Sequence, residues 1–219
     1  MYRGDFMKLS ALFHRCISIP YVRVENSADY AIERIGDTLY IYFECSNGEI
    51  DWLNNFDFPS APYKRMKGDT WHAHRGFLRV FKSVEPYIAH HVSDLSIKSI
   101  VTVGYSHGAA IATLCHEYVW YNRPDIRTQI QGYAFASPRV VWGYLPYSLA
   151  KRWENLIVIR NINDVVTHVP PRILGYTHVG KILEIGKKGK YSATAAHRPE
   201  NILAELLEYE HHQNKINGH

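Results

Sequence analysis

IVTVGYSHGAAIATL, residues 100–114, contains the pattern Gly-x-Ser-x-Gly centred on Ser106. A β-type apolar run precedes the pattern, and small and apolar residues typical of a helix follow it. Strand, sharp turn and helix is the context that distinguishes a nucleophile elbow from a chance match. In such a turn the Ser106 hydroxyl stands at a helix N-terminus, where the dipole and free N–H groups favour an alkoxide and an oxyanion. The alternative is a glycine-bounded turn in which Ser106 only caps the helix.

Length and composition indicate one soluble-type α/β domain. The chain has 219 residues, of which 46% are apolar, enough to bury a large core. Its formal net charge of +4 is mild, and the basic residues form no long run. We therefore expect no nucleic-acid partner. The densest basic patch, residues 187–190, indicates a solvated hairpin tip.

Three cysteines, Cys16, Cys45 and Cys115, show no C-x-x-C spacing, and an odd number cannot all pair. A disulfide framework or a cysteine-rich metal site is therefore not expected. The first ten residues include both acidic and basic side chains, and no apolar signal-peptide core follows them. No apolar stretch approaches the length of a membrane span. These features predict a cytoplasmic location.

The pattern along the chain shows no repeats, no low-complexity linker and no sharp change in composition, so we expect a single domain. The expected elements are a helix at 5–16, a hairpin of strands at 28–35 and 38–43, a short helix at 51–56, a loop at 58–69, a helix at 77–91 that Pro86 bends or ends, a strand at 99–103, a helix at 106–121, strands at 130–135 and 156–160, a hairpin at 177–185 and 190–193, and a helix at 199–210. Helices that alternate with short apolar strands predict a largely parallel sheet covered on both faces.

A nucleophilic serine needs a base, and the base needs an acid that fixes its tautomer and stabilises its cation. Asp164 is the best candidate acid, because it follows the apolar run 156–160 in a loop just beyond a predicted strand. The alternative is a turn aspartate that bonds its own backbone. Asp125 competes weakly, since Pro124-Asp125 is typical of a helix-capping turn.

Two late histidines are candidate bases. His178 lies inside a predicted strand, where a histidine is often structural, whereas His197 lies in a loop before the last helix. Functional side chains are concentrated on such loops, so the pattern favours His197 and leaves His178 open. His72 and His74 form an H-x-H pair, but no third metal ligand is close in sequence. The histidine pairs at 90–91 and 211–212 indicate exposed helix faces.

An oxyanion needs two hydrogen-bond donors. One is expected from the backbone N–H of the residue after the nucleophile, which is His107. The other is expected from a loop after an earlier strand. Ser46 follows the predicted strand that ends at Phe43, and its hydroxyl or amide could serve. The alternative for Ser46 is an ordinary turn residue.

Six segments match, in the right order, the patterns of one family. They are FECS at 43–46 with DWLNNFDF at 51–58, HRGF at 74–77, VGYSHGA at 103–109, FASPRV at 135–140, NINDVVTHVPP at 161–171 and YTHVG at 176–180. Together they resemble the class 3 lipases, the group that contains the fungal triacylglycerol lipases and related hydrolases. The resemblance covers about residues 39–206.

This resemblance implies an α/β-hydrolase fold, with a mostly parallel central sheet and helices on both faces, in a single domain over residues 1–219. Carried over position by position, it implies the nucleophile Ser106, the acid Asp164 and the base His197. It places His178 at a structural histidine. It implies oxyanion donors at Ser46 and His107, and a lid at about residues 47–58.

The resemblance also implies a serine hydrolase that cleaves carboxylic esters, above all lipid acyl esters, through an acyl-enzyme. The partners implied are a small-molecule or lipid ester substrate and transient contact with a lipid interface. No metal or organic cofactor is expected.

Three departures from the family pattern affect the expected substrate range. Glu44-Cys45 replaces Arg-Gly, Tyr105 and His107 replace His and Leu beside the nucleophile, and the segment from Asp164 to His197 is short. They leave two alternatives open. One is a catalytically inactive lipase-like binding or scaffold protein. The other is an acyl hydrolase of another class, such as a phospholipase, a thioesterase or a phenolic-ester esterase, or an acyltransferase.

Overall fold

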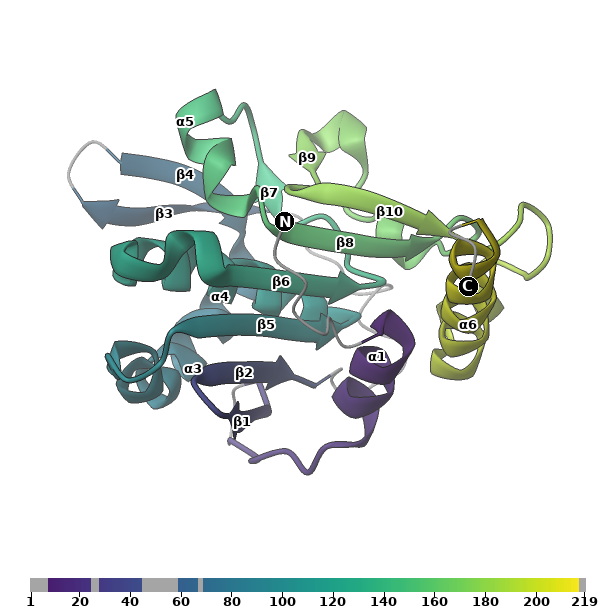
Figure 1. Ribbon diagram of the computed structural model, residues 1–219. Helices are drawn as coiled ribbons and strands as arrows, with labels where there is room; N and C mark the ends of the chain where they lie inside the picture. Colours follow the sequence, from purple (N-terminus) through teal and green to yellow (C-terminus); the bar gives the residue numbers. More distant parts are fainter. Residues whose placement is uncertain (1–7, 25–27, 45–58, 67–68, 217–219) are drawn as a thin grey trace.

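A six-stranded sheet forms the centre of the molecule (Figure 1). The computed structural model describes residues 8–24, 28–44, 59–66 and 69–216. The strands follow the order β1-β2-β5-β6-β8-β10, and all neighbours are parallel except β1 and β2. Their bounds are β1 (Tyr30–Ile35), β2 (Thr38–Phe43), β5 (Ser99–Tyr105), β6 (Ile130–Phe135), β8 (Leu156–Asn161) and β10 (Lys181–Ile185). The predicted parallel sheet and the hairpin at Gly36-Asp37 are therefore present.

The register aligns the carboxyl ends of the parallel strands. Phe43 lies opposite Gly104, and Tyr105 lies opposite Phe135. Farther along the sheet, Ile185 lies opposite Asn161. Residues that follow these strands therefore emerge along one edge of the sheet, where ligand sites of α/β proteins lie.

Helices cover both faces of the sheet. On one face lie α3 (Arg75–Ser93) and α4 (His107–Asn122), and on the other lie α1 (Leu9–Ser18) and α6 (Pro199–Ile216). Alternate residues of β5 serve the two faces, because Ile100 belongs to the core under α3 and α4 while Val101 and Val103 belong to the core under α1 and α6. A buried side chain of this size stabilises the fold by about 1.5–3 kcal/mol.

A smaller antiparallel sheet lies beside the central one. It contains β3 (Ser60–Met66), β4 (Asp69–His74), β7 (Val141–Trp142) and β9 (Tyr176–Thr177) in the order β3-β4-β7-β9. The loop predicted at 58–69 is therefore wrong for most of its length. Pro62 obscured the strand in the sequence, but β3 is an edge strand, where the missing N–H of a proline is tolerated.

The hairpin predicted at 177–185 and 190–193 is also wrong. Thr177 ends β9 in the small sheet, whereas Lys181–Ile185 forms β10 in the central sheet, and residues 190–193 form no strand. Gly180 takes a positive φ of 82° between the two strands. A Cβ at that position would lie 2.5 Å from the Leu156 carbonyl oxygen, so the chain changes sheets where only glycine fits.

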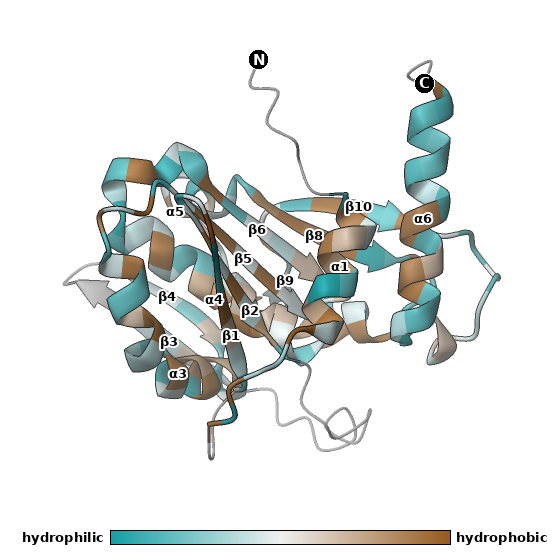
Figure 2. Ribbon diagram, turned by 60° about the horizontal axis from the view of Figure 1, so that its bottom comes forward, coloured by the Kyte–Doolittle hydropathy of each residue, from teal (hydrophilic) through white to brown (hydrophobic). Residues whose placement is uncertain are grey.

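Helix bounds differ from the predictions mainly at their ends. Pro86 lies inside α3 without ending it, because Phe77, Phe81, Val84 and Ile88 bury one face of the helix across the proline. α6 continues to Ile216, and its exposed last turns are hydrophilic (Figure 2). The helix predicted at 5–16 is described only from Leu9 on, as α1. The short helix at 51–56 and the lid at 47–58 lie outside the described residues.

Short helices complete the fold. They are α5 (Tyr147–Ala150), η1 (Pro124–Gln129), η2 (Lys151–Trp153), η3 (Val166–His168), η4 (Arg172–Leu174) and η5 (Ala195–His197). Of the helices in the described ranges, none combines the length and the apolar character that crossing a lipid bilayer requires.

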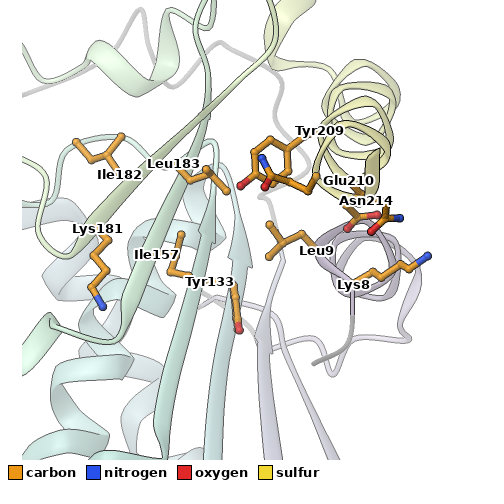
Figure 3. A pocket seen from close by; sticks show the side chains of 11 residues that line it. Lys8, Leu9, Tyr133, Ile157, Lys181, Ile182, Leu183, Tyr209, Glu210 and Asn214 are labelled. Carbon is orange, nitrogen blue, oxygen red and sulfur yellow. The ribbon is translucent and has the colours of Figure 1, made fainter. Parts of the chain in front are cut away.

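A groove of about 570 Å³ lies between the start of α1, the last turns of α6 and the strands β6, β8 and β10 (Figure 3). Its lining is largely apolar and includes Leu9, Tyr133, Ile157, Leu183 and Tyr209. Ser106, Asp164 and His197 are not among the residues that line it.

His116 makes the stability of the fold depend on pH. It is buried in α4, and burial lowers its pKa to about 4. Since an unfolded histidine titrates near pH 6.5, the unfolded state binds a proton between about pH 6.5 and 4 that the folded state does not. This histidine therefore stabilises the fold above that window, and the stabilisation is lost as the pH falls through it.

We expect His116→Gln to flatten the dependence of the unfolding free energy on pH by up to about 1.4 kcal/mol per pH unit between pH 6 and 4.5. Urea unfolding at several pH values measures this, with the exposed His211→Gln as the control. Equal slopes for wild type and His116→Gln would contradict the prediction.

Candidate active site

Ser106 occupies a strained turn between β5 and α4. Its φ of 56° and ψ of −119° are rare for a residue with a side chain. The turn is held by hydrogen bonds on both sides: the Ser106 N–H donates to the Phe135 carbonyl at 2.9 Å, and the Ser106 carbonyl accepts from the Ala109 N–H at 3.0 Å. The strand–turn–helix context predicted from the sequence is therefore present at Ser106.

The two glycines of the pattern allow this turn because backbone approaches backbone there. A Cβ at Gly104 would lie 2.2 Å from the Gly108 carbonyl oxygen. A Cβ at Gly108 would lie 2.2 Å from the Phe43 carbonyl oxygen. Real Cβ contacts are never this short, so both positions require glycine. The second contact also brings the end of β2 against the start of α4, beside Ser106.

Ser106, His197 and Asp164 form a hydrogen-bonded line. The distance from His197 Nε2 to Ser106 Oγ is 2.8 Å, and the distance from His197 Nδ1 to Asp164 Oδ2 is 2.8 Å. All three side chains are buried. With Asp164 ionised, Nδ1–H donates to the carboxylate, and Nε2 is left to accept the Ser106 hydroxyl proton. The structure thus brings together the three residues that the sequence singled out.

The second carboxylate oxygen of Asp164 is also engaged. Its Oδ1 accepts a hydrogen bond from the Val166 N–H at 2.8 Å, and the Asp164 N–H donates to the Asn161 carbonyl at 3.0 Å. Asn161 is the last residue of β8. The carboxylate is therefore fixed directly beyond a central strand and directed at His197.

Asn163 links the loop of the acid to the loop of the histidine. We call residues 161–165 the acid loop and residues 186–197 the histidine loop. Asn163 Nδ2 donates to the Lys187 carbonyl at 2.8 Å, and Asn163 Oδ1 accepts from the Gly189 N–H at 2.8 Å. Sequence reasoning missed this role. The only signal for it was the position of Asn163 directly before Asp164.

Two lysines of the histidine loop attach it to α6. Lys187 and Lys190 both bind Glu208, at 2.8 and 2.9 Å, and Lys190 also pairs with the buried Glu205. Hydrogen bonds from Lys187 and Lys190 lower the pKa of Glu208 to about 2. The basic patch predicted to be a solvated tip is therefore exposed but ion-paired.

The competing candidates for the base and the acid, His178 and Asp125, have other hydrogen-bond and ion-pair partners. His178 Nε2 is 2.8 Å from the Thr167 carbonyl oxygen, and burial lowers the pKa of His178 to about 4. A ring held neutral and bonded to the backbone is typical of a structural histidine. Asp125 binds Arg123 at 2.9 Å, next to the C-terminal end of α4. Neither residue is part of the line through Ser106.

His107 is the first residue of α4, so its backbone N–H lies at the helix N-terminus next to Ser106. Its ring packs edge-on against Phe77 with centroids 5.5 Å apart. Burial, followed by the charge of nearby His74, lowers the pKa of His107 to about 4. The imidazole of His107 is therefore neutral near pH 7 and belongs to the packing around the nucleophile.

The other proposed oxyanion donor, Ser46, and Cys45 lie outside the described residues. Glu44, the first of the two departures in that loop, is described. Burial and a hydrogen bond with Asp29 raise the pKa of Glu44, and its N–H donates to the Asp29 carbonyl at 3.1 Å. This residue therefore ties the end of β2 to the segment before β1.

His72 and His74 have different environments on β4. His74 is buried, its Nδ1 accepts from the Phe77 N–H at 3.4 Å, and it thereby caps α3. His72 packs against Trp142 with ring centroids 5.4 Å apart. Over the part of the chain that the structure describes, no three histidine, cysteine or acidic residues gather in a way that could hold a metal ion.

Comparison with known sequences identifies similar proteins over most of the chain. The sequence profile of the family described as Lipase (class 3) matches residues 40–174, more than half of the chain. A lipase of Rhizopus niveus is 25% identical over 151 residues, which are 65% of this chain and 37% of that protein. Phospholipase A1-II 7 of Oryza sativa subsp. indica is 28% identical over 170 residues, with 62% and 41% covered. The chain thus spans less than half the length of these relatives.

Solved structures show the same architecture. The lipase of Rhizopus microsporus var. chinensis matches with a TM-score of 0.66 at 21% identity, covering 86% of this chain and 72% of that one. At this level of identity the similarity shows the fold. The mostly parallel sheet with helices on both faces is that of the α/β-hydrolases, which confirms the predicted fold class.

We expect Asn163→Ala to lower the free energy of unfolding by about 1–3 kcal/mol, since two hydrogen bonds between the acid and histidine loops are lost. Urea unfolding measures the change. Asn122→Ala is the control, because the Asn122 side chain donates to the Tyr118 carbonyl within the end of α4. A loss no larger than that of the control would show that Asn163 does not hold the two loops together.

Proposed function

This chain belongs to the class 3 lipase family, and on that premise we propose that it hydrolyses carboxylic esters of lipids through an acyl-enzyme. The observation that carries the proposal is the hydrogen-bonded line from Ser106 Oγ through the His197 ring to the Asp164 carboxylate. An alcohol, an imidazole and a carboxylate in this order form the constellation used for acyl transfer.

In the first step His197 Nε2 removes the proton of Ser106 as Oγ attacks the ester carbonyl carbon. The carbonyl π electrons move to oxygen, which gives a tetrahedral oxyanion. Asp164 accepts the Nδ1–H bond, keeps the ring in the tautomer that leaves Nε2 free, and stabilises the imidazolium that forms. Collapse of the intermediate breaks the ester C–O bond, and the imidazolium gives its proton to the departing alcohol.

In the second step water replaces the alcohol. His197 takes one proton from the water as its oxygen attacks the acyl carbon, and Ser106 leaves with that proton. The products are a carboxylic acid and the original enzyme. Two steps with a covalent intermediate replace one difficult displacement.

We assign the oxyanion to the backbone N–H of His107 and to Ser46. The position of His107 at the start of α4 supports the first assignment, because the helix dipole adds to the hydrogen bond. The family resemblance alone supports the second. Loss of one such donor typically lowers kcat by about 10²- to 10³-fold.

The relatives support lipid esters as the proposed substrate class. The two sequence relatives are a lipase and phospholipase A1-II 7, and both names describe hydrolysis of lipid esters. Two apolar side chains of the acid loop, Ile162 and Val165, are exposed beside Asp164. They support our further proposal of transient contact with a lipid interface. The cytoplasmic location stays a prediction from the sequence.

The intact hydrogen-bonded line favours catalysis over the alternative of a non-catalytic lipase-like binding or scaffold protein. A protein without chemistry to perform has no need to keep Ser106 in a strained conformation with a buried histidine and carboxylate behind it. The choice among triacylglycerols, phospholipids and other acyl donors is an outcome of the experiment below.

We expect Ser106→Ala to lower the hydrolysis rate of p-nitrophenyl esters by about 10⁴-fold or more, because no oxygen nucleophile remains. The matched control is Ser99→Ala, at the opposite end of the same strand, which should retain the wild-type rate. Initial rates over acyl chains of graded length, followed by triacylglycerol and phospholipid substrates, identify the substrate class. Hydrolysis that persists unchanged in Ser106→Ala would refute the proposal.

A further inference from the structure

Tyr105, the last residue of β5, makes two contacts with His197, which lies 92 positions later. Its phenol hydroxyl donates a hydrogen bond to the His197 backbone carbonyl oxygen, with 2.5 Å between the two oxygens. Its ring also lies face to face with the imidazole, with centroids 5.3 Å apart and an interplanar angle of 27°. Tyr105 itself is buried.

The Tyr105 ring is held from its other side by α1. The Phe13 ring meets it edge-on, with centroids 5.5 Å apart and an interplanar angle of 83°. Phe13 is completely buried and also packs against Phe135, the last residue of β6. The tyrosine is therefore fixed between a helix, a neighbouring strand and the histidine loop.

We propose that Tyr105 is a positioning residue that sets where the His197 imidazole stands relative to Ser106 Oγ. The inference rests on the function proposed above. Tyr105 is covalently joined to Ser106, so its backbone moves with the nucleophile. Its hydroxyl holds the backbone of His197, so the same residue fixes both ends of the Ser106–His197 hydrogen bond.

The hydrogen bond from Tyr105 matters because His197 lies in the short helix η5. His197 is the last residue of a three-residue 3₁₀ turn, whose hydrogen-bond geometry is poorer than that of an α-helix. Without the phenol hydroxyl, the His197 carbonyl loses its buried donor, and the backbone that carries the imidazole loses a point of attachment. A small displacement of a general base is sufficient to slow proton transfer.

The residue that makes this contact is one of the positions at which this chain departs from the class 3 pattern. The class 3 pattern has a histidine directly before the nucleophile, and this chain has Tyr105 there. The phenol hydroxyl is the group that reaches the His197 carbonyl.

The test is Tyr105→Phe, which removes the hydroxyl and keeps the ring. We expect kcat for a p-nitrophenyl ester to fall about tenfold, with KM within about twofold of wild type, because the hydrogen bond supports the reacting geometry and not substrate binding. The matched control is Tyr133→Phe. Tyr133 lies on the adjacent strand β6, and its hydroxyl bonds to the Gln131 side chain instead. The control should leave both constants unchanged.

A second variant covers the case in which Tyr105→Phe does not fold. Phe13→Leu loosens the support of the Tyr105 ring without touching the hydroxyl, and we expect a smaller fall in kcat, about two- to fivefold, again at constant KM. Thermal unfolding of every variant ensures that rates are compared well below the transition.

Unchanged kcat in both Tyr105→Phe and Phe13→Leu would overturn the inference, even if the melting temperature falls, because the role would then be structural only. An equal fall in Tyr133→Phe would overturn it as well. Ser106→Ala separates this outcome from failure of the proposed function. If that variant retains hydrolysis, the proposed function is wrong and Tyr105 has no base to position.

Discussion

The site depends on the two hydrogen bonds by which the His197 imidazole bridges Ser106 and Asp164. The two ring nitrogens of His197 face Ser106 Oγ and Asp164 Oδ2, each at 2.8 Å, so the ring has a partner on both sides and little freedom to turn. The three residues come from the ends of two central strands and from the loop before α6. The fold must therefore place three distant segments within a few tenths of an ångström, and most of the contacts around the site serve that placement.

The parallel sheet and the close approach of its backbones provide the first part of that placement. The carboxyl ends of β5 and β8 open on the same edge, which puts Ser106 and Asp164 within reach of one ring. Gly104 and Gly108 let β2, β5 and α4 meet at distances that no side chain allows. The histidine loop is then attached at several points: Asn163 ties it to the acid loop, and its lysines bind α6.

The sequence predicted those parts of the molecule whose signals are local. The turn at Ser106 is one, because glycine spacing, the strand before it and the helix after it are all visible within fifteen residues. The edge strand β3 was missed, because Pro62 and the charged residues around it are typical of a loop, whereas its pairing with β4 and the burial of Tyr63 in the core stabilise it as a strand. The pattern favours His197 over His178 without excluding His178, since the choice depends on the path of a loop that no short pattern encodes. The Asn163 hydrogen bonds depend on the same path.

The central claim is that His197 activates Ser106 as a nucleophile. The most direct measurement is the rate at which a fluorophosphonate labels the native protein, with the modified residue located by mass spectrometry. In this reaction Ser106 Oγ forms a bond to phosphorus, fluoride leaves, and the serine proton passes to His197. We predict labelling at Ser106 in wild type and labelling at least about 100-fold slower in His197→Gln, which lacks the base. Labelling of His197→Gln at the wild-type rate, or modification of a different residue, would contradict this account.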